Sequence, residues 1–429
     1  MPFMPFSILG IWFRGLLGIV IFAGAGYLLK EWYDESHVVE PIVVETVDAT
    51  GVRGPDRNVV KEAREPAAVR RVFRFDPGFN RETALLAGGL ALLMWGLVGR
   101  RVGQGVEKLV SGASASALSD DPPKSDRGGE VHTITRPDGS VLRAECYGPA
   151  EGTPVVLTHG WGANSTEWYY LKRDLAARFR VIVWDEPGLG LSKKPDNNDY
   201  RLENLAADLD AVVSLAGGRP ALLLGHSIGG MITLTYAKAF PEEFRRKVAG
   251  VVLVHTTYTN PVRTTRMAGL HTAIEKPVIV PLLYLTIGLW PLVWLMNWVS
   301  YFNGTAYRST KKSSFAGTQT PAQVEFVARF MPHARPDVLA RGMLGMIAYD
   351  ATRTVAKLPV PALVVAGDRD TTTLPEASQY MATAAPRGQL ATLAPARHMG
   401  LIEHHGRFGC LVTEFADSCV PAGLVGRPS

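Results

Sequence analysis

Short apolar runs alternate with helix-compatible segments along the chain from Val131 onward. Apolar runs of this length, bounded by polar residues, are typical of strands buried on both faces of a sheet. The intervening segments, such as 165–179 and 204–216, have helical spacing. This alternation predicts a mostly parallel α/β sheet with helices on both faces, entered through an antiparallel hairpin around Pro137-Asp138-Gly139. The runs are VVLTHG (155–160), VIVWD (181–185), ALLLGHS (221–227), VVLVH (251–255) and ALVVAGD (362–368).

One of these strands ends in a sequence that is typical of a catalytic serine. Gly225-His226-Ser227-Ile228-Gly229 follows the run ALLLGHS and precedes a helical segment. Glycines at these positions permit a sharp, strained turn that raises the serine hydroxyl above the edge of the sheet. We therefore expect Ser227 to be a nucleophile.

A serine nucleophile needs a base, and the base needs an acid that orients it. In a parallel sheet both must come from later strand ends at the same carboxyl edge. His398 follows the run GQLATLA, and Asp368 and Asp370 follow ALVVA. The predicted order along the chain is therefore serine, aspartate, histidine.

At this point residues 131–415 resemble the α/β-hydrolase family. The resemblance implies an eight-stranded, mostly parallel sheet with a helical cap insertion. In that family the acid commonly stands three residues after the strand-end glycine, which here is Gly367, so the resemblance favours Asp370, with Asp368 as the alternative. Arg397 replaces a glycine that often precedes the family's histidine.

Two backbone N–H groups are expected to bind the oxyanion of the tetrahedral intermediate. One belongs to Ile228, directly after the nucleophile. The other is carried over from the resemblance of His159-Gly160-Trp161-Gly162 to the family's His-Gly oxyanion loop, and belongs to Trp161. The His159 side chain is interpreted as a tie that holds this loop, with substrate contact as a further role.

Two apolar segments precede the predicted hydrolase. Residues 8–29 and 83–99 are long enough, or nearly so, to cross a bilayer, and their glycines and alanines allow close helix packing. We expect a transmembrane helical hairpin. The loop between them carries six acids in 31–48 and eight basic residues in 51–81, so the positive-inside rule gives no single orientation.

A third apolar stretch, residues 278–299, contains no charge. A single crossing here would separate Ser227 from Asp370 and His398, so we interpret the stretch as part of a cap. Pro281 and Pro291 favour two shorter helices within it. Trp290 and Trp294, together with Trp298, recur every four residues and are candidate contacts for an apolar substrate or for lipid. A dry cap core is the alternative.

Several functional classes are disfavoured by the rest of the sequence. The net charge is only +5, without a basic run, so nucleic acid is not an expected partner. Nucleotide loops and metal-ligand spacings are absent, and no cofactor or metal is expected. The three cysteines are interpreted as free thiols, with a Cys410–Cys419 disulfide as the alternative.

The sequence thus predicts a serine hydrolase that is held at a membrane and cleaves carboxylic esters, with apolar, lipid-like substrates. A non-catalytic membrane protein of the same fold is the alternative from another class. Thioesterase, acyltransferase and carbon–carbon hydrolase chemistry on the same residues remain open. The predicted parts are a membrane region (1–110), a linker (111–130), a first core segment (131–259), a cap (260–345) and a second core segment (346–420).

Overall fold

The computed structural model describes residues 7–41, 69–111 and 121–419 of the chain. These residues divide into two compact units. One comprises Met1–Gly18 with Val98–Ser429, and the other comprises Ile19–Leu97.

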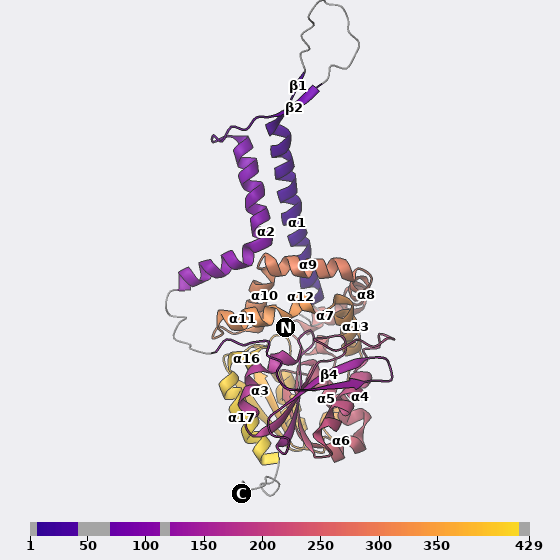
Figure 1. The fold of residues 1–429 in the computed structure, drawn as a ribbon. Helices are drawn as coiled ribbons and strands as arrows, with labels where there is room; N and C mark the ends of the chain where they lie inside the picture. The colour runs from indigo at the N-terminus through magenta and orange to yellow at the C-terminus, as the bar shows by residue number, and fades with distance from the viewer. Residues whose placement is uncertain (1–6, 42–68, 112–120, 420–429) are drawn as a thin grey trace, which may run out of the picture. The chain divides into compact units, whose positions relative to one another are not determined.

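The larger unit is built on an eight-stranded sheet, which confirms the predicted fold class (Figure 1). The strand order is β10-β9-β8-β7-β5-β6-β4-β3. Strands β3 and β4 pair antiparallel, as do β4 and β6, and every other pair in the sheet is parallel. The bounds are β3 Glu130–Thr135, β4 Val141–Tyr147, β5 Thr153–Thr158, β6 Phe179–Trp184, β7 Ala221–His226, β8 Val248–Val254, β9 Ala362–Gly367 and β10 Gly388–Leu393.

The central strands are buried on both faces because two apolar cores flank them. Leu223 on β7 belongs to one core, and its neighbours Leu222 and Leu224 belong to the other, as the period of two in a strand requires. The first core is completed by α4 (Leu202–Val213), α5 (Ile228–Ala239), α6 (Pro241–Lys247), α14 (Thr352–Val355) and α15 (Pro375–Ala384). The second is completed by α3 (Tyr169–Leu175), α16 (Gly400–Glu403) and α17 (His405–Cys419).

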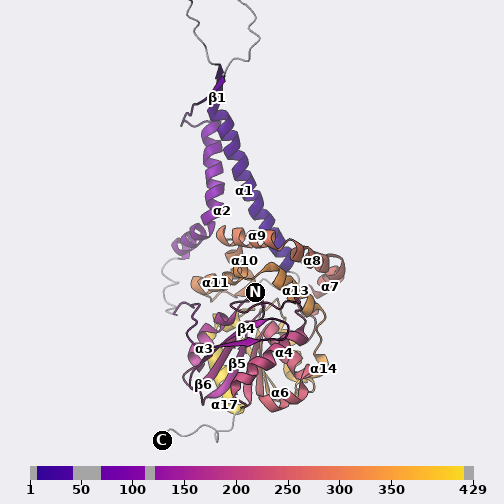
Figure 2. The same cartoon turned by 45° about the vertical axis from the view of Figure 1, so that its right-hand side comes forward.

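Between β8 and β9 the chain forms a set of helices, here called the cap (Figure 2). Strands β8 and β9 are paired neighbours, so this segment leaves and rejoins the same sheet and cannot be a single membrane crossing. The helices are α7 (Ala268–Ile274), α8 (Val280–Gly288), α9 (Trp290–Phe302), α10 (Thr305–Ser314), α11 (Pro321–Ala328), α12 (Phe330–His333) and α13 (Pro336–Ile347).

The long apolar stretch forms two helices, as expected, but Pro281 does not divide them. A π-helical turn, Glu275–Ile279, joins α7 to α8 in one continuous helical stretch, and Pro281 lies within the α8 part of it. The break lies at Leu289, and Pro291 opens α9. The expectation for Pro281 was therefore wrong, and that for Pro291 is consistent with the structure.

The N-terminal region contains α1 (Ser7–Ser36) and α2 (Arg81–Ser111), the latter longer than expected. Within the smaller unit, glycines of α2 face side chains of α1. A Cβ added at Gly89 would lie 2.7 Å from Leu29, and one at Gly96 would lie 2.6 Å from Phe22. The absence of side chains at these two positions therefore lets the helices pack closely.

A short antiparallel ribbon, β1 (His37–Pro41) with β2 (Val69–Phe73), follows α1 and precedes α2 and was not expected. Residues 42–68, which make up about half of the predicted acidic and basic loop, lie outside the described part. Of the predicted linker, 112–120 also lie outside it. Residues that follow them are bound to the core, since Tyr169 and Lys172 on α3 donate hydrogen bonds to Asp121 and Asp126.

Within the part of the chain that the structure describes, three helical stretches are long and apolar enough to cross a membrane, judged by length and composition. They are Ile8–Ser36, Arg81–Val106 and Ala268–Gly288. The first two include the predicted spans, and the third lies in the cap.

Candidate active site

Ser227 lies on a strained turn between β7 and α5. Its backbone has φ 54° and ψ −116°, a conformation that non-glycine residues rarely adopt. A Cβ at Gly225 would lie 2.3 Å from the Gly229 backbone, and a Cβ at Gly229 would lie 2.4 Å from the Thr158 carbonyl oxygen. Only glycine fits at either position, so the motif is explained by the closeness of this turn to α5 and β5.

Asp370 and His398 meet at the same edge of the sheet. Asp370 follows β9, His398 follows β10, and the His398 Nδ1 is 2.8 Å from an Asp370 carboxylate oxygen. The same carboxylate accepts hydrogen bonds from the Thr372 N–H, the Thr373 N–H and the Thr373 hydroxyl. Asp368 instead accepts the Ala396 N–H and so ties two loops together.

The electrostatics of this pair favour a charged aspartate and a neutral histidine. Burial alone would raise the pKa of Asp370, but His398 and the surrounding hydrogen bonds outweigh it and hold that pKa well below its ordinary value. Burial lowers the pKa of His398 to about 4, although Asp370 opposes the shift. With its Nδ1–H donated to Asp370, the neutral ring keeps the lone pair of Nε2 for a proton.

The His398 Nε2 is buried and has no hydrogen-bond partner among the described residues. A Ser227–His398 hydrogen bond is therefore not formed in this structure. Both side chains are almost fully buried, with exposed fractions of 5% and 0%. Such hydrogen bonds are often long in the absence of substrate and shorten when it binds.

The loop after β5 carries the second expected oxyanion donor. The Trp161 indole N–H donates to the Leu339 carbonyl oxygen on α13 at 3.0 Å, which holds the loop against the cap. The backbone N–H groups of Trp161 and Ile228 donate to no acceptor within the described ranges. Ile228 opens α5, and the first N–H groups of a helix have no partner inside it.

His159 holds the same loop from beneath. Its Nε2 accepts the Glu186 N–H at 3.0 Å, so its Nδ1 carries the proton and donates to the Gly160 carbonyl oxygen at 2.9 Å. The ring is fully buried and both nitrogens are engaged. These bonds fit the expected tie and correct the further expectation that His159 contacts substrate.

The two tryptophans proposed as substrate contacts lie on α9. The Arg335 guanidinium covers the Trp290 ring at 4.1 Å, and the Trp294 indole N–H donates to the Pro332 carbonyl oxygen at 2.9 Å. Trp294 is 41% exposed. The structure thus places these side chains against other cap residues and does not bring them to Ser227.

Sequence inspection missed a buried polar network beneath the site. The Glu167 carboxylate accepts the Gly160 N–H at 2.8 Å and pairs with the His226 Nδ1 at 3.1 Å. The His226 Nε2 lies 3.1 Å from the His398 carbonyl oxygen. The network therefore connects the oxyanion loop to the histidine loop. His226 stands within the serine motif, but nothing in the pattern around Glu167 distinguishes it from an ordinary helix carboxylate.

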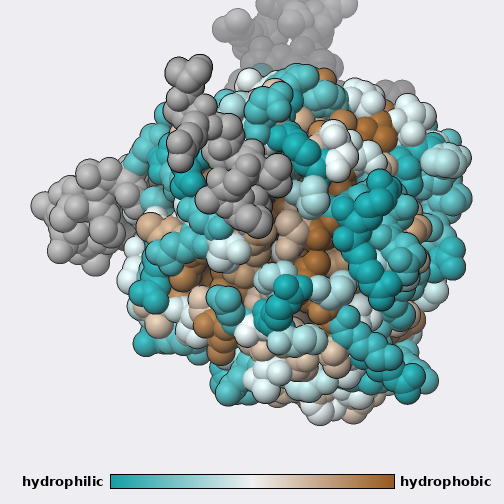
Figure 3. Space-filling model, turned by 90° about the horizontal axis from the view of Figure 1, so that it is seen from below, coloured by the Kyte–Doolittle hydropathy of each residue, from teal (hydrophilic) through white to brown (hydrophobic). Residues whose placement is uncertain are grey.

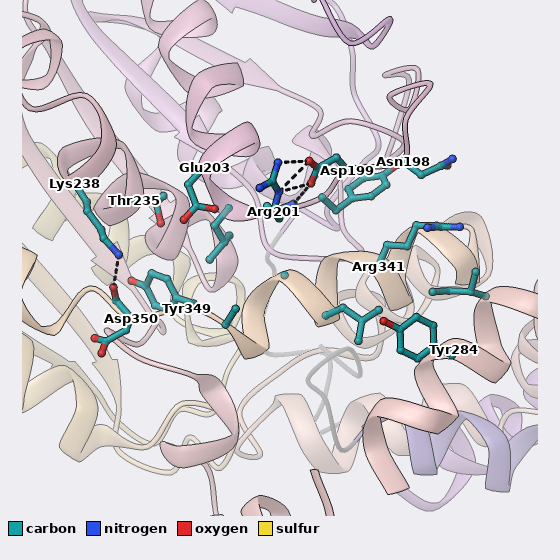
Figure 4. A pocket seen from close by; sticks show the side chains of 16 residues that line it. Asn198, Asp199, Arg201, Glu203, Thr235, Lys238, Tyr284, Arg341, Tyr349 and Asp350 are labelled. Atoms are coloured by element: carbon teal, nitrogen blue, oxygen red, sulfur yellow. Dashed lines mark hydrogen bonds and ion pairs between the residues drawn. The ribbon is translucent and has the colours of Figure 1, made fainter. Parts of the chain in front are cut away.

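A cleft of about 530 Å³ lies at the seam between the core and the cap. Figure 4 shows Glu203, Thr235 and Lys238 from the core on one side, and Tyr284 and Arg341 from the cap on the other. Within the cleft, Arg201 pairs with Asp199, and Lys238 donates to the Asp350 carbonyl oxygen. Neither Ser227 nor His398 lines this cleft.

Comparison with known proteins agrees with this architecture. A serine hydrolase-like protein of Danio rerio is 34% identical over 127 residues, which are 29% of this chain and 38% of that protein. The pimeloyl-[acyl-carrier protein] methyl ester esterase of Yersinia pseudotuberculosis is 28% identical over 268 residues, which are 61% of this chain and 93% of that enzyme. The crystal structure of an esterase from Rhodococcus sp. ECU1013 has a TM-score of 0.54 and 25% identity, covering 68% of this chain and 99% of its own.

The family model for the alpha/beta hydrolase fold matches residues 153–405, which is more than half of the chain. The matched segment begins at β5, contains the Ser227 turn and the whole cap, and extends beyond His398. The chain belongs to the alpha/beta hydrolase fold family.

Proposed function

We propose that the protein is a serine hydrolase of carboxylic esters, with Ser227 as nucleophile, His398 as base and Asp370 as the acid that orients it. The observation that carries this proposal is the convergence of three strand ends. The strained Ser227 follows the end of β7. Asp370 and His398 follow the ends of β9 and β10, and the His398 Nδ1 is 2.8 Å from the buried Asp370 carboxylate. This set of groups supports acyl transfer through a covalent intermediate.

In the proposed reaction the Ser227 oxygen attacks the ester carbonyl carbon while its proton passes to the His398 Nε2. The negative charge that develops on the carbonyl oxygen is bound by the N–H groups of Trp161 and Ile228. Collapse of the tetrahedral intermediate breaks the bond to the alcohol, which takes the proton from His398. Water, deprotonated by the same histidine, then attacks the acyl-enzyme and releases the acid and free Ser227.

We further propose that the substrate has an apolar chain and that the protein is attached to a membrane. Helix α9 supports both proposals because it exposes large apolar side chains while it buries polar side chains as well as apolar ones. Its buried face includes Asn297 and Ser300, which are 2% and 1% exposed, whereas Trp294 and Leu295 are 41% and 59% exposed. Buried polar and exposed apolar side chains are the informative exceptions in a water-soluble fold. The spans in α1 and α2 provide the proposed attachment.

The decisive experiment is labelling of the full chain, in detergent micelles, with a fluorophosphonate probe. We expect wild-type protein to be labelled, and Ser227→Ala and His398→Ala not to be. Ser192→Ala is a matched control, because Ser192 lies in a loop near the site and its hydroxyl donates to the Asp185 carbonyl oxygen. Failure of folded wild-type protein to react would overturn the proposal and favour the non-catalytic alternative.

A panel of esters with acyl chains of increasing length tests the substrate class. We expect kcat/KM to rise with chain length, because each buried methylene contributes about 0.8 kcal/mol. Thioesters of the same chains serve as the comparison for the alternative chemistry. A preference for acetyl esters would contradict the proposed apolar substrate without affecting the assignment of Ser227.

A further inference from the structure

The first part of α1 is packed into the cap. Ile8 and Ile11 are 2% and 4% exposed and belong to the same apolar core as cap residues. A Cβ added at Gly15 would lie 2.1 Å from Met296, and one at Gly18 would lie 2.5 Å from Val299, both on α9. This part of α1 therefore fits against α9 only because glycines stand at the contact.

Polar contacts extend this interface to other cap helices. The Trp12 indole N–H donates to the Thr286 hydroxyl on α8 at 3.0 Å. The Arg14 guanidinium donates to the Ser309 hydroxyl on α10 at 3.1 Å. A helix that served only as a membrane anchor would not need hydrogen bonds to particular side chains of the cap.

Helix α2 contacts the cap through one carboxylate. Arg100 forms an ion pair with Glu325 on α11, and Gln104 donates to the same carboxylate at 2.9 Å. The Tyr301 hydroxyl on α9 donates to it at 2.6 Å, and the Arg100 guanidinium lies 4.4 Å from the Tyr301 ring centroid. Glu325 thus joins α2 to two cap helices.

The cap in turn braces the loop that carries Trp161. The Trp161 indole bonds to Leu339, and a Cβ at Gly342 would lie 2.0 Å from the indole ring. Helix α13 therefore lies in contact with the ring, and any shift of α13 must move it. The expected oxyanion donor is the backbone N–H of this same residue.

The cap also braces the loop that carries His398. The Met399 N–H donates to the Ser314 carbonyl oxygen at 2.9 Å. The Glu403 carboxylate accepts three successive backbone N–H groups, from Ala316, Gly317 and Thr318. Both loops of the candidate site are therefore bonded to the cap, which is itself bonded to α1 and α2.

From these contacts we propose that the N-terminal helices hold the cap in the position in which it aligns the Trp161 and His398 loops. Arg100, Glu325 and Trp12 are then positioning residues for the reaction, in addition to any role of α1 and α2 in attachment to a membrane. The inference rests on the proposed function, because alignment matters only if Ser227 reacts. A misplacement of about 1 Å far from the reacting atoms can lower a rate by about a hundredfold.

The test compares two chemically identical substitutions in the full chain in detergent micelles. Glu325→Gln removes the ion pair that reaches the cap. Glu35→Gln removes the pair between Glu35 and Arg81, whose atoms are 2.6 Å apart and which lies in the smaller unit. The readouts are the rate of fluorophosphonate labelling, kcat and KM for a soluble short-chain ester, and amide hydrogen exchange in residues 159–163 and 336–347.

For Glu325→Gln we expect labelling and kcat to fall about tenfold or more, KM to change by less than about twofold, and exchange to rise in both segments. For Glu35→Gln we expect wild-type values. The exchanged pair Arg100→Glu with Glu325→Arg should recover most of the loss. If Glu325→Gln does not yield folded protein, Trp12→Phe, which removes only the indole hydrogen bond, replaces it, with the same direction expected.

Wild-type labelling and exchange in Glu325→Gln would overturn the inference, as would equal losses in Glu35→Gln. Its failure is distinguishable from failure of the proposed function. An unreactive wild-type protein refutes the function, whereas exchange in residues 336–347 still reports whether the N-terminal helices hold the cap.

Discussion

The central strands of the sheet and the helices of the cap differ in how many apolar side chains they expose. In β7 and β9 every residue is buried, and the interior on both faces is apolar. In α9, Asn297 and Ser300 are buried as well as the apolar Val293 and Met296, whereas Leu295 and Phe302 are exposed. Seen from below the sheet, the surface of the molecule carries polar side chains over most of its area, with apolar residues between them (Figure 3). The comparison indicates that the two regions are built for different surroundings, and the proposed lipid contact of the cap follows from it.

The outward apolar side chains are spread over consecutive cap helices, which distinguishes them from single exposed leucines elsewhere. Scattered exposed apolar residues are normal, whereas apolar residues gathered on a few successive helices point to an interaction surface. This set consists of Met267, Leu270, Val278, Tyr284, Leu285, Leu289, Leu292, Trp294, Leu295 and Phe302.

The largest expected effect concerns the buried polar groups of the core. Asp370→Asn should lower kcat by about 10⁴-fold without loss of the fold, because an amide cannot hold His398 in the required tautomer. Asp368→Asn is the matched control, since its side-chain oxygen can still accept the Ala396 N–H. Steady-state ester hydrolysis measures both. Equal effects of the two substitutions would refute the choice of Asp370 as the acid.

A smaller effect is expected at the seam between the two regions. Gly342→Ala places a Cβ 2.0 Å from the Trp161 ring and should lower kcat by about ten- to a hundredfold. Gly269→Ala, also in a cap helix, meets nothing within 4 Å and should leave kcat unchanged. The comparison of kcat and melting temperature for the two variants checks this. A harmless Gly342→Ala would mean that the cap does not constrain the oxyanion loop.

The dry environment of the core site also predicts the pH dependence. Burial lowers the pKa of His398 to about 4, and only the neutral ring can accept the Ser227 proton. Activity is therefore present above this pKa and lost as the pH falls through it, by about tenfold for each further unit. The acid limb of kcat/KM, measured with folded protein at each pH, should bend near pH 4. A bend near 6.5 would show that the site is more hydrated than the structure indicates.

The smallest expected effect comes from substituting one exposed leucine in each of the two regions. Leu295 on α9 and Leu191 in the core are 59% and 60% exposed. Leu295→Glu should lower hydrolysis of an ester dissolved in a bilayer several-fold, because it removes an apolar contact with lipid that contributes about 1–2 kcal/mol. Hydrolysis of a soluble ester should not change. Leu191→Glu should spare both. If only Leu191→Glu lowered hydrolysis of the bilayer-dissolved ester, the membrane contact would be assigned to the core.

Local pattern was sufficient to predict the sheet and to select Ser227 and His398 as candidates, but it left Asp368 and Asp370 open, and only the family resemblance favoured Asp370. Alternating strands and helices implied parallel pairing, and the positions after strand ends brought Ser227, Asp370 and His398 to one edge. The roles of these residues remain predictions, although the structure brings Asp370 and His398 into contact. Pattern failed for Glu167, which looks like any helix carboxylate until the fold places it between Gly160 and His226.

The apolar stretch 278–299 also shows what sequence pattern could and could not predict. Hydropathy established that it is apolar. Its place between Ser227 and the predicted partners Asp370 and His398 implied that its ends return to one sheet. Neither observation could establish that the helix continues through Pro281, that α9 turns its asparagine inward, or that α1 packs against it. These depend on partners far away in the chain, and a residue's neighbours in sequence carry no information about such partners.

The sequence by itself determined the alternation of strands and helices from Val131 onward, the serine turn and the apolar character of the N-terminal and cap helices. The reason is that these features follow from spacing along the backbone and from steric limits at single residues. Only the tertiary structure decided which faces meet, which polar groups are buried together and which helices hold the cap. Those outcomes depend on the burial of surfaces contributed by distant segments, so they exist only once the chain has packed.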